Sequence, residues 1–107
     1  MSDDVDLGED MPVLAQVLEM TVDSAERSGL DAATYMKVRI AALAAMGANP
    51  GSWMLNLAAA SDAGLGIDDV QAVLVGIAPV IGTARTVAAA GNALRALGLA
   101  AAAEGDD

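Results

Sequence analysis

Glycine, proline and aspartate recur along this 107-residue chain where helices are expected to begin and end. These helix-boundary residues constrain the fold more than any other feature. Between these residues the apolar side chains fall three or four positions apart, which is the period of a helix with one buried face. The predicted helices span residues 11–28, 32–46, 50–64, 67–79 and 84–97. The pattern predicts an all-α fold of about five helices without a strand.

Capping residues support these boundaries. Asp10, Asp31 and Asn49 each precede a predicted helix, and their side-chain oxygens can accept hydrogen bonds from the first free N–H groups. The most apolar segment, 70–81, is expected to form a buried helix followed by a turn. It is too short to span a bilayer, so no membrane partner is expected.

Small side chains dominate the apolar content. Hydrophobic residues make up 55% of the chain, yet it has one Trp, one Tyr and no Phe. A chain of this length forms one domain, which we place at 11–100 between flexible acidic termini at 1–10 and 101–107. So much apolar surface on so short a chain also favours a homo-oligomer.

The charge balance excludes several kinds of partner. The formal net charge is −10, with five basic residues in the whole chain. Nucleic acids and anionic membrane surfaces both require a basic surface, so neither is an expected partner. The N-terminal sequence has no basic region followed by an apolar run, as a secretory signal would have, and we expect a cytoplasmic protein.

Two reactive residue types are missing altogether. The chain contains no histidine and no cysteine, which supply most acid/base, nucleophilic and soft-metal chemistry near neutral pH. Their absence argues against thiol peroxidase activity, histidine-assisted hydrolysis and zinc sites. We therefore expect no metal and no cofactor.

Four segments together carry a resemblance to a known family. Residues 30–43, LDAATYMKVRIAAL, resemble the L-D-x-x-T-R-E-L-V-x-I-A-A-L segment of the carboxymuconolactone decarboxylase family, which includes the AhpD-like alkylhydroperoxidases. Residues 56–65 resemble its H-L-x-x-A-x-x-A-G-x motif, and 67–77 resemble its T-x-x-E-I-x-E-V-L-L-Q-x-A helix. Residues 80–82 and 92–94 resemble its Y-A-G turn and N-A-L helix. The resemblance implies an AhpD-like helical bundle that assembles as a trimer or hexamer.

The family's catalytic groups are replaced in this chain. Asn56 occupies the position of the histidine in the decarboxylase branch, and Tyr35 and Met36 replace its R-E pair. An amide does not exchange a proton near pH 7 and a thioether is not a base. No catalytic residue is therefore assigned, and Tyr35, Met36 and Asn56 are the family-equivalent positions.

Two interpretations of function remain open. In the first, the chain is a catalytically silent member that binds a small organic acid or apolar ligand, or serves as an assembly module. In the second, it is an active lyase or isomerase on a carboxylated lactone or related acid, with a cation such as Lys37, Arg39 or Arg85 stabilising an enolate and Tyr35 donating a proton. The candidate binding residues are Tyr35, Met36, Arg39, Trp53, Met54, Asn56 and Arg85. Taken singly, Met36 and Met54 are better explained as core packing, and Trp53 as sealing an interface.

Overall fold

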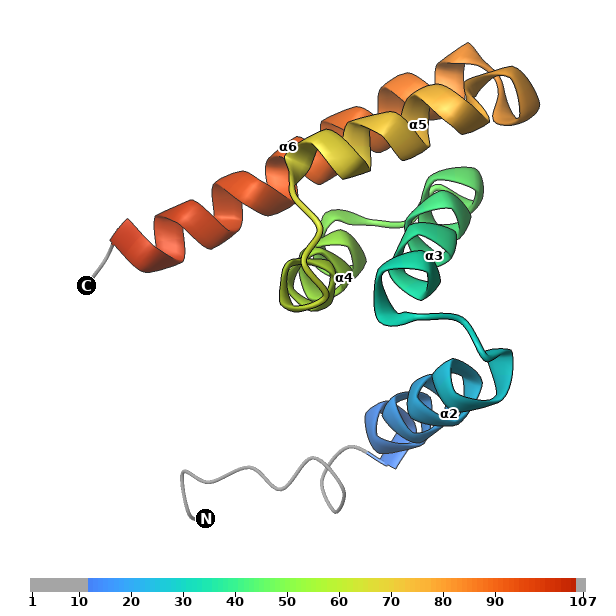
Figure 1. Cartoon of the computed structure of the whole chain (residues 1–107). Coiled ribbons are helices and arrows are strands. Elements are labelled where there is room, and N and C mark those ends of the chain that lie inside the picture. The colour runs from blue at the N-terminus through green and yellow to red at the C-terminus, as the bar shows by residue number, and fades with distance from the viewer. Residues whose placement is uncertain (1–11, 106–107) are drawn as a thin grey trace. The chain divides into compact units, whose positions relative to one another are not determined.

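The computed structural model describes residues 12–105, and the regular structure in that range is helical throughout (Figure 1). The helices are α2 (Pro12–Ser28), α3 (Ala32–Met46), α4 (Pro50–Asp62), α5 (Ile67–Ile81) and α6 (Thr83–Gly105). The expected all-α fold with about five helices is confirmed for these residues. The acidic segment at 1–10 and the Asp10 cap lie outside the described residues.

The chain divides into two compact units between Asp31 and Ala32. The first contains α2, which buries none of its own residues and exposes Val13, Met20 and Val22. The second contains α3 to α6 and holds the buried core. The expected single domain at 11–100 stays a prediction.

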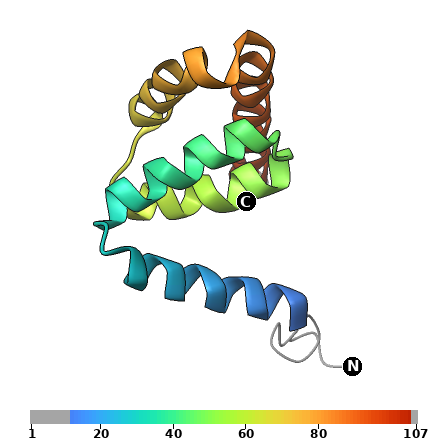
Figure 2. The same cartoon turned by 90° about the vertical axis from the view of Figure 1, so that its right-hand side faces the viewer.

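The core of the second unit is built from narrow apolar stripes with many alanines. In this unit α3 packs on α4, α5 and α6, while α6 also packs on α4 and α5. Helices α5 and α6 pack on each other as a hairpin (Figure 1), and Figure 2 shows them diverging from the turn that joins them. The buried side chains are Tyr35, Met36, Ile40, Ala44, Trp53, Ala60, Val70, Leu74, Ala89, Ala93 and Ala96. Because alanine has so small a side chain, α6 can approach its neighbours closely with Trp53 filling the largest space.

The turn between α3 and α4 is held by backbone and side-chain hydrogen bonds. Gly47 has a φ of 70°, and the Ala48 N–H donates to Leu43 O at 3.0 Å, which closes α3 in a Schellman motif. Two side chains of α6 reach the same turn. Arg85 donates to Ala45 O, and Asn92 Nδ2 donates to Ala48 O at 3.1 Å.

Asn49 caps α4 as its place in the sequence predicted. Its Oδ1 accepts a hydrogen bond from the Ser52 N–H at 2.9 Å, and Pro50 follows in the first turn. At the start of α5, Asp69 Oδ2 accepts from the Gly66 N–H at 2.9 Å. Asp69 therefore holds the first turn of α5 through a hydrogen bond as well as through its charge.

Three features of α5 and α6 differ from the sequence-based prediction. Helix α5 does not end at Pro79 but includes it and ends at Ile81. A proline this close to a helix end removes a single N–H donor, and the helix continues for two more residues. The segment 70–81 is not buried throughout, since Val75 is 74% and Val80 is 85% exposed. Helix α6 continues past Leu97 to Gly105, because its alanine-rich end favours a helix.

Within residues 12–105, none of the single helices has both the length and the apolar character to cross a bilayer. The pair α4 and α5 reaches that length and composition only when taken together, and the two helices are bent by 118° at the break between them.

Candidate functional site

The structure brings together three of the sequence-predicted residues, Tyr35, Arg39 and Asn56. Arg39 Nε donates to Asn56 Oδ1 at 2.9 Å, and Arg39 Nη1 donates to the Tyr35 hydroxyl oxygen at 3.1 Å. The guanidinium carbon lies 5.6 Å from the centroid of the Tyr35 ring, within the range of a cation–π contact. Arg39 is thus held by neutral groups from α3 and α4.

Helix geometry explains why these residues meet. Tyr35 and Arg39 are four positions apart on α3, so both side chains lie on one face. Asn56 lies on α4, which packs against α3. The second atom of its amide is also engaged, because Nδ2 donates to Ser52 O at 2.9 Å. With Oδ1 bound to Arg39 and Nδ2 bound to Ser52, the Asn56 side chain is fixed at both ends.

Arg39 is half-buried and has no acidic partner among residues 12–105. The ion pair recorded in this part of the chain joins Arg27 and Asp23 on α2, both well exposed. The hydrogen bonds of Arg39 use Nε and Nη1, and Nη2 donates to no group of the described residues. A partly desolvated guanidinium with neutral partners keeps its full positive charge available, and its remaining N–H groups suit a carboxylate.

A hollow of about 220 Å³ opens beside this arginine. Its lining consists of Arg39 and Asn56 together with Ala42, Leu43 and Met46. The site therefore has one positively charged group, one amide and an apolar wall. The three wall residues were not predicted from the sequence, although their spacing of three, four and seven positions after Arg39 places them on the same face of α3.

The other candidate residues lie elsewhere in the second unit. Met36 and Trp53 are in the core, and neither lines the hollow beside Arg39. Met54 is 38% exposed on α4 and is also absent from that lining. Arg85 is engaged with the carbonyl of Ala45 at the end of α3. Of the seven candidates, Tyr35, Arg39 and Asn56 form the cluster.

Trp53 has an unusual feature for a core residue. Its side chain is completely buried, and its indole Nε1 has no hydrogen-bond partner among the described residues. An unpaired buried N–H group costs about 1–3 kcal/mol. The free energy gained by burying the large ring outweighs this penalty, and the residue acts as the main filler between α4 and its neighbours.

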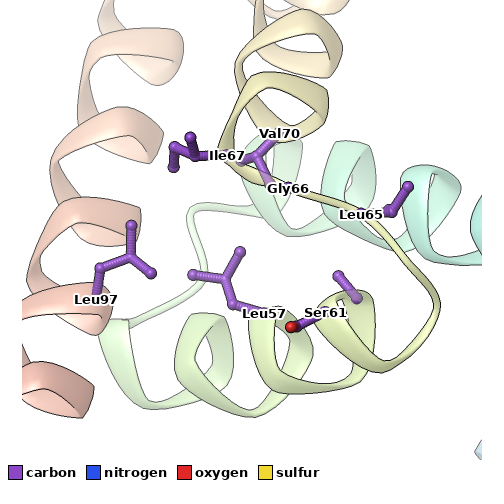
Figure 3. A pocket seen from close by; sticks show the side chains of 8 residues that line it. Leu57, Ser61, Leu65, Gly66, Ile67, Val70 and Leu97 are labelled. Carbon is purple, nitrogen blue, oxygen red and sulfur yellow. The ribbon is translucent and has the colours of Figure 1, made fainter.

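A second hollow, of about 200 Å³, lies between α4, the start of α5 and α6 (Figure 3). Leu57, Ile67 and Leu97 point toward it, and Ser61 supplies the one side-chain oxygen of its lining. It contains no charged group that would orient a ligand. The Arg39 cluster is therefore the better candidate site.

Residues 12–105 contain no group of three or more histidine, cysteine or carboxylate side chains that could hold a metal ion. Comparison with protein-family models, with curated proteins and with solved structures finds no match for this chain. The site must therefore be interpreted from its own geometry and from the sequence motifs.

Proposed function

We propose that this chain is a carboxymuconolactone decarboxylase-like protein without the family's catalysis, and that it binds a small organic acid at Arg39. The observation that carries the proposal is the arrangement of Tyr35, Arg39 and Asn56, in which a half-buried cation is held by neutral groups beside a hollow. Such a cation attracts a carboxylate, and the fixed neighbours reduce the entropy lost on binding.

The state of Asn56 supports a silent site. Its amide is hydrogen-bonded to Arg39 and to the backbone of Ser52, so it positions the guanidinium. An amide cannot exchange protons at neutral pH. Met36, the other replaced family position, is buried and carries no acid or base. Neither position supplies the proton transfer that a decarboxylase requires.

The alternative is a lyase in which Arg39 stabilises an enolate and Tyr35 donates the proton. The contact between the Arg39 guanidinium and the Tyr35 hydroxyl favours this alternative, because it places a cation next to the proposed donor. Release of carbon dioxide from a carboxymuconolactone, measured with the unmodified chain, would establish the lyase and contradict the silent binding protein. We expect no release above the rate without protein.

Calorimetric titration with benzoate tests the binding proposal. We expect saturable binding to the unmodified chain and at least a tenfold loss of affinity in Arg39→Gln, which keeps a long polar side chain but removes the charge. Lys37→Gln is the matched control, because Lys37 is an exposed cation on the same helix. Equal affinity in all three proteins would contradict the proposal.

We also propose that the chain forms a homo-oligomer, in keeping with the trimers and hexamers that the family resemblance implies. The support is the exposed apolar surface of the α5–α6 hairpin, where Val75, Val80, Val87 and Leu94 are all well exposed. Surfaces of this kind are commonly covered by a partner. Light scattering at micromolar concentration should give a mass of three or six chains, and a monomer would contradict this proposal.

A further inference from the structure

The hollow beside Arg39 holds one positive charge. Lys37 is on the same helix but two positions away, which turns it by about 200° to another face, and its side chain is exposed. Arg85 donates to Ala45 O and does not line the hollow. Arg39 is therefore the one cation of the lining, and it can pair with a single carboxylate.

The rest of the hollow is apolar. Ala42, Leu43 and Met46 form the wall that extends from Arg39 along one face of α3. Met46 is 84% exposed, and its flexible thioether side chain can adapt to the surface of a bound molecule. A ligand held at Arg39 by its carboxylate would place the rest of its atoms against these three side chains.

The size of the hollow limits the ligand. Its volume is about 220 Å³, and an apolar cavity of about 150 Å³ is known to accept benzene. This hollow is open to solvent, and an apolar body of about six to eight non-hydrogen atoms would occupy it. Longer molecules would extend into water without further contact.

We propose that the site selects monocarboxylic acids with a compact apolar body over dicarboxylic acids, an inference that rests on the proposed function. A second carboxylate at the far end of the ligand would lie against Leu43 and Met46, where the lining offers no hydrogen-bond donor. It would lose part of its hydration without compensation. The single cation and the apolar wall together favour ligands that carry one carboxylate.

The test compares three ligands of the same length by calorimetry with the full chain. Hexanoate carries one carboxylate, hexanedioate carries a second in place of the methyl group, and hexanamide carries no charge. We expect hexanoate to bind about tenfold more tightly than either of the others. Butyrate should bind about fourfold more weakly than hexanoate, because each half-buried methylene contributes about a twofold change.

The negative results of this test distinguish the selectivity from the carboxylate site itself. If hexanedioate binds as tightly as hexanoate, the monocarboxylate selectivity is wrong while the carboxylate site stands. If butyrate binds as tightly as hexanoate, the contact of the ligand with the apolar wall is wrong. If hexanoate and benzoate both fail to bind, the proposed function and the selectivity fall together.

A pair of variants tests whether Met46 contacts the apolar part of the ligand. Met46→Gln replaces a wall side chain with a polar one of similar length, and should reduce the preference for hexanoate over butyrate to about twofold. Met54→Gln is the matched control, because Met54 is also partly exposed but lies outside the hollow. An unchanged preference in Met46→Gln, or the same loss in both variants, would overturn the role of the wall.

Discussion

Arg39 on α3 and Asn56 on α4 are joined by a hydrogen bond of 2.9 Å from the guanidinium Nε to the amide Oδ1. The bond links two helices and fixes the direction of the guanidinium while leaving its charge unneutralised. A carboxylate in place of Asn56 would pair with Arg39 and cancel that charge. The neutral amide is therefore the property on which the binding proposal depends.

Asn56→Asp should abolish carboxylate binding without disrupting the fold. The new carboxylate has nearly the same shape as the amide. It loses the hydrogen bond that Asn56 Nδ2 donates to Ser52 O, but gains an ion pair with Arg39 that competes with any ligand. We expect the affinity for benzoate to fall at least tenfold while the helical circular dichroism spectrum is unchanged. Calorimetry measures the affinity.

The control for Asn56→Asp is Gln16→Glu. Gln16 is exposed on α2, and the substitution adds the same negative charge outside the second unit. Its affinity for benzoate should match that of the unmodified chain. If Gln16→Glu weakens binding as much as Asn56→Asp, net charge governs binding and the local pairing does not.

Trp53 should tolerate phenylalanine far better than alanine. Trp53→Phe keeps most of the buried ring and removes the unpaired Nε1–H, so the lost contacts and the removed penalty offset each other. We expect the free energy of unfolding to change by no more than about 1 kcal/mol. Trp53→Ala leaves a cavity and should lower it by about 3–5 kcal/mol. Urea unfolding followed by circular dichroism distinguishes the two, and equal losses would contradict this interpretation.

Arg85→Ala should destabilise the end of α3. The Arg85 guanidinium donates to Ala45 O in the last turn of that helix, where a positive charge also complements the helix dipole. The expected loss is about 1 kcal/mol in the free energy of unfolding. Lys37→Ala removes the same charge from an exposed position on α3 and should change stability by less than about 0.5 kcal/mol. A larger effect from Lys37→Ala would show that overall charge is responsible.

Two glycine substitutions should have opposite effects. Gly82 ends α5 with a φ of 93°, which an alanine adopts only with strain, so Gly82→Ala should lower the free energy of unfolding by about 1–2 kcal/mol. Gly76 lies within α5, and a Cβ added there meets no atom within 4 Å. Gly76→Ala should therefore raise it by about 0.5–1 kcal/mol. Thermal unfolding of both variants shows whether each substitution stabilises or destabilises the fold. Destabilisation by Gly76→Ala would contradict the open helical position described for Gly76.

Most of the helices follow from local sequence signals. Asn49 with Pro50 marks the start of α4, because the Asn49 side chain accepts a hydrogen bond from a free N–H of the first turn. Gly47 ends α3, because it allows the turn in which the last carbonyl groups of the helix accept hydrogen bonds. The end of α6 was missed. The sequence predicted an end at Leu97, but the alanines that follow favour helix strongly enough to carry α6 to Gly105.

The candidate site was predicted in part. The spacing of Tyr35 and Arg39 places them on one face, but their contact with Asn56 depends on how α4 is rotated against α3. That rotation is hard to predict from the sequence, because the apolar residues of α4 occupy most of its faces and do not mark one buried side. The sequence also did not distinguish Trp53, which is in the core, and Met54, which lies outside the hollow, from Asn56, which lines it.

The most direct test is nuclear magnetic resonance of the arginine Nε–H groups during a titration with hexanoate. The Arg39 signal, assigned by its loss in Arg39→Lys, reports on the guanidinium that the account places in contact with the carboxylate. We predict that this signal shifts to saturation with the calorimetric Kd, while those of Arg27, Arg85 and Arg95 stay in place. An Arg39 signal that does not move, or four signals that move together, would contradict a carboxylate site at Arg39.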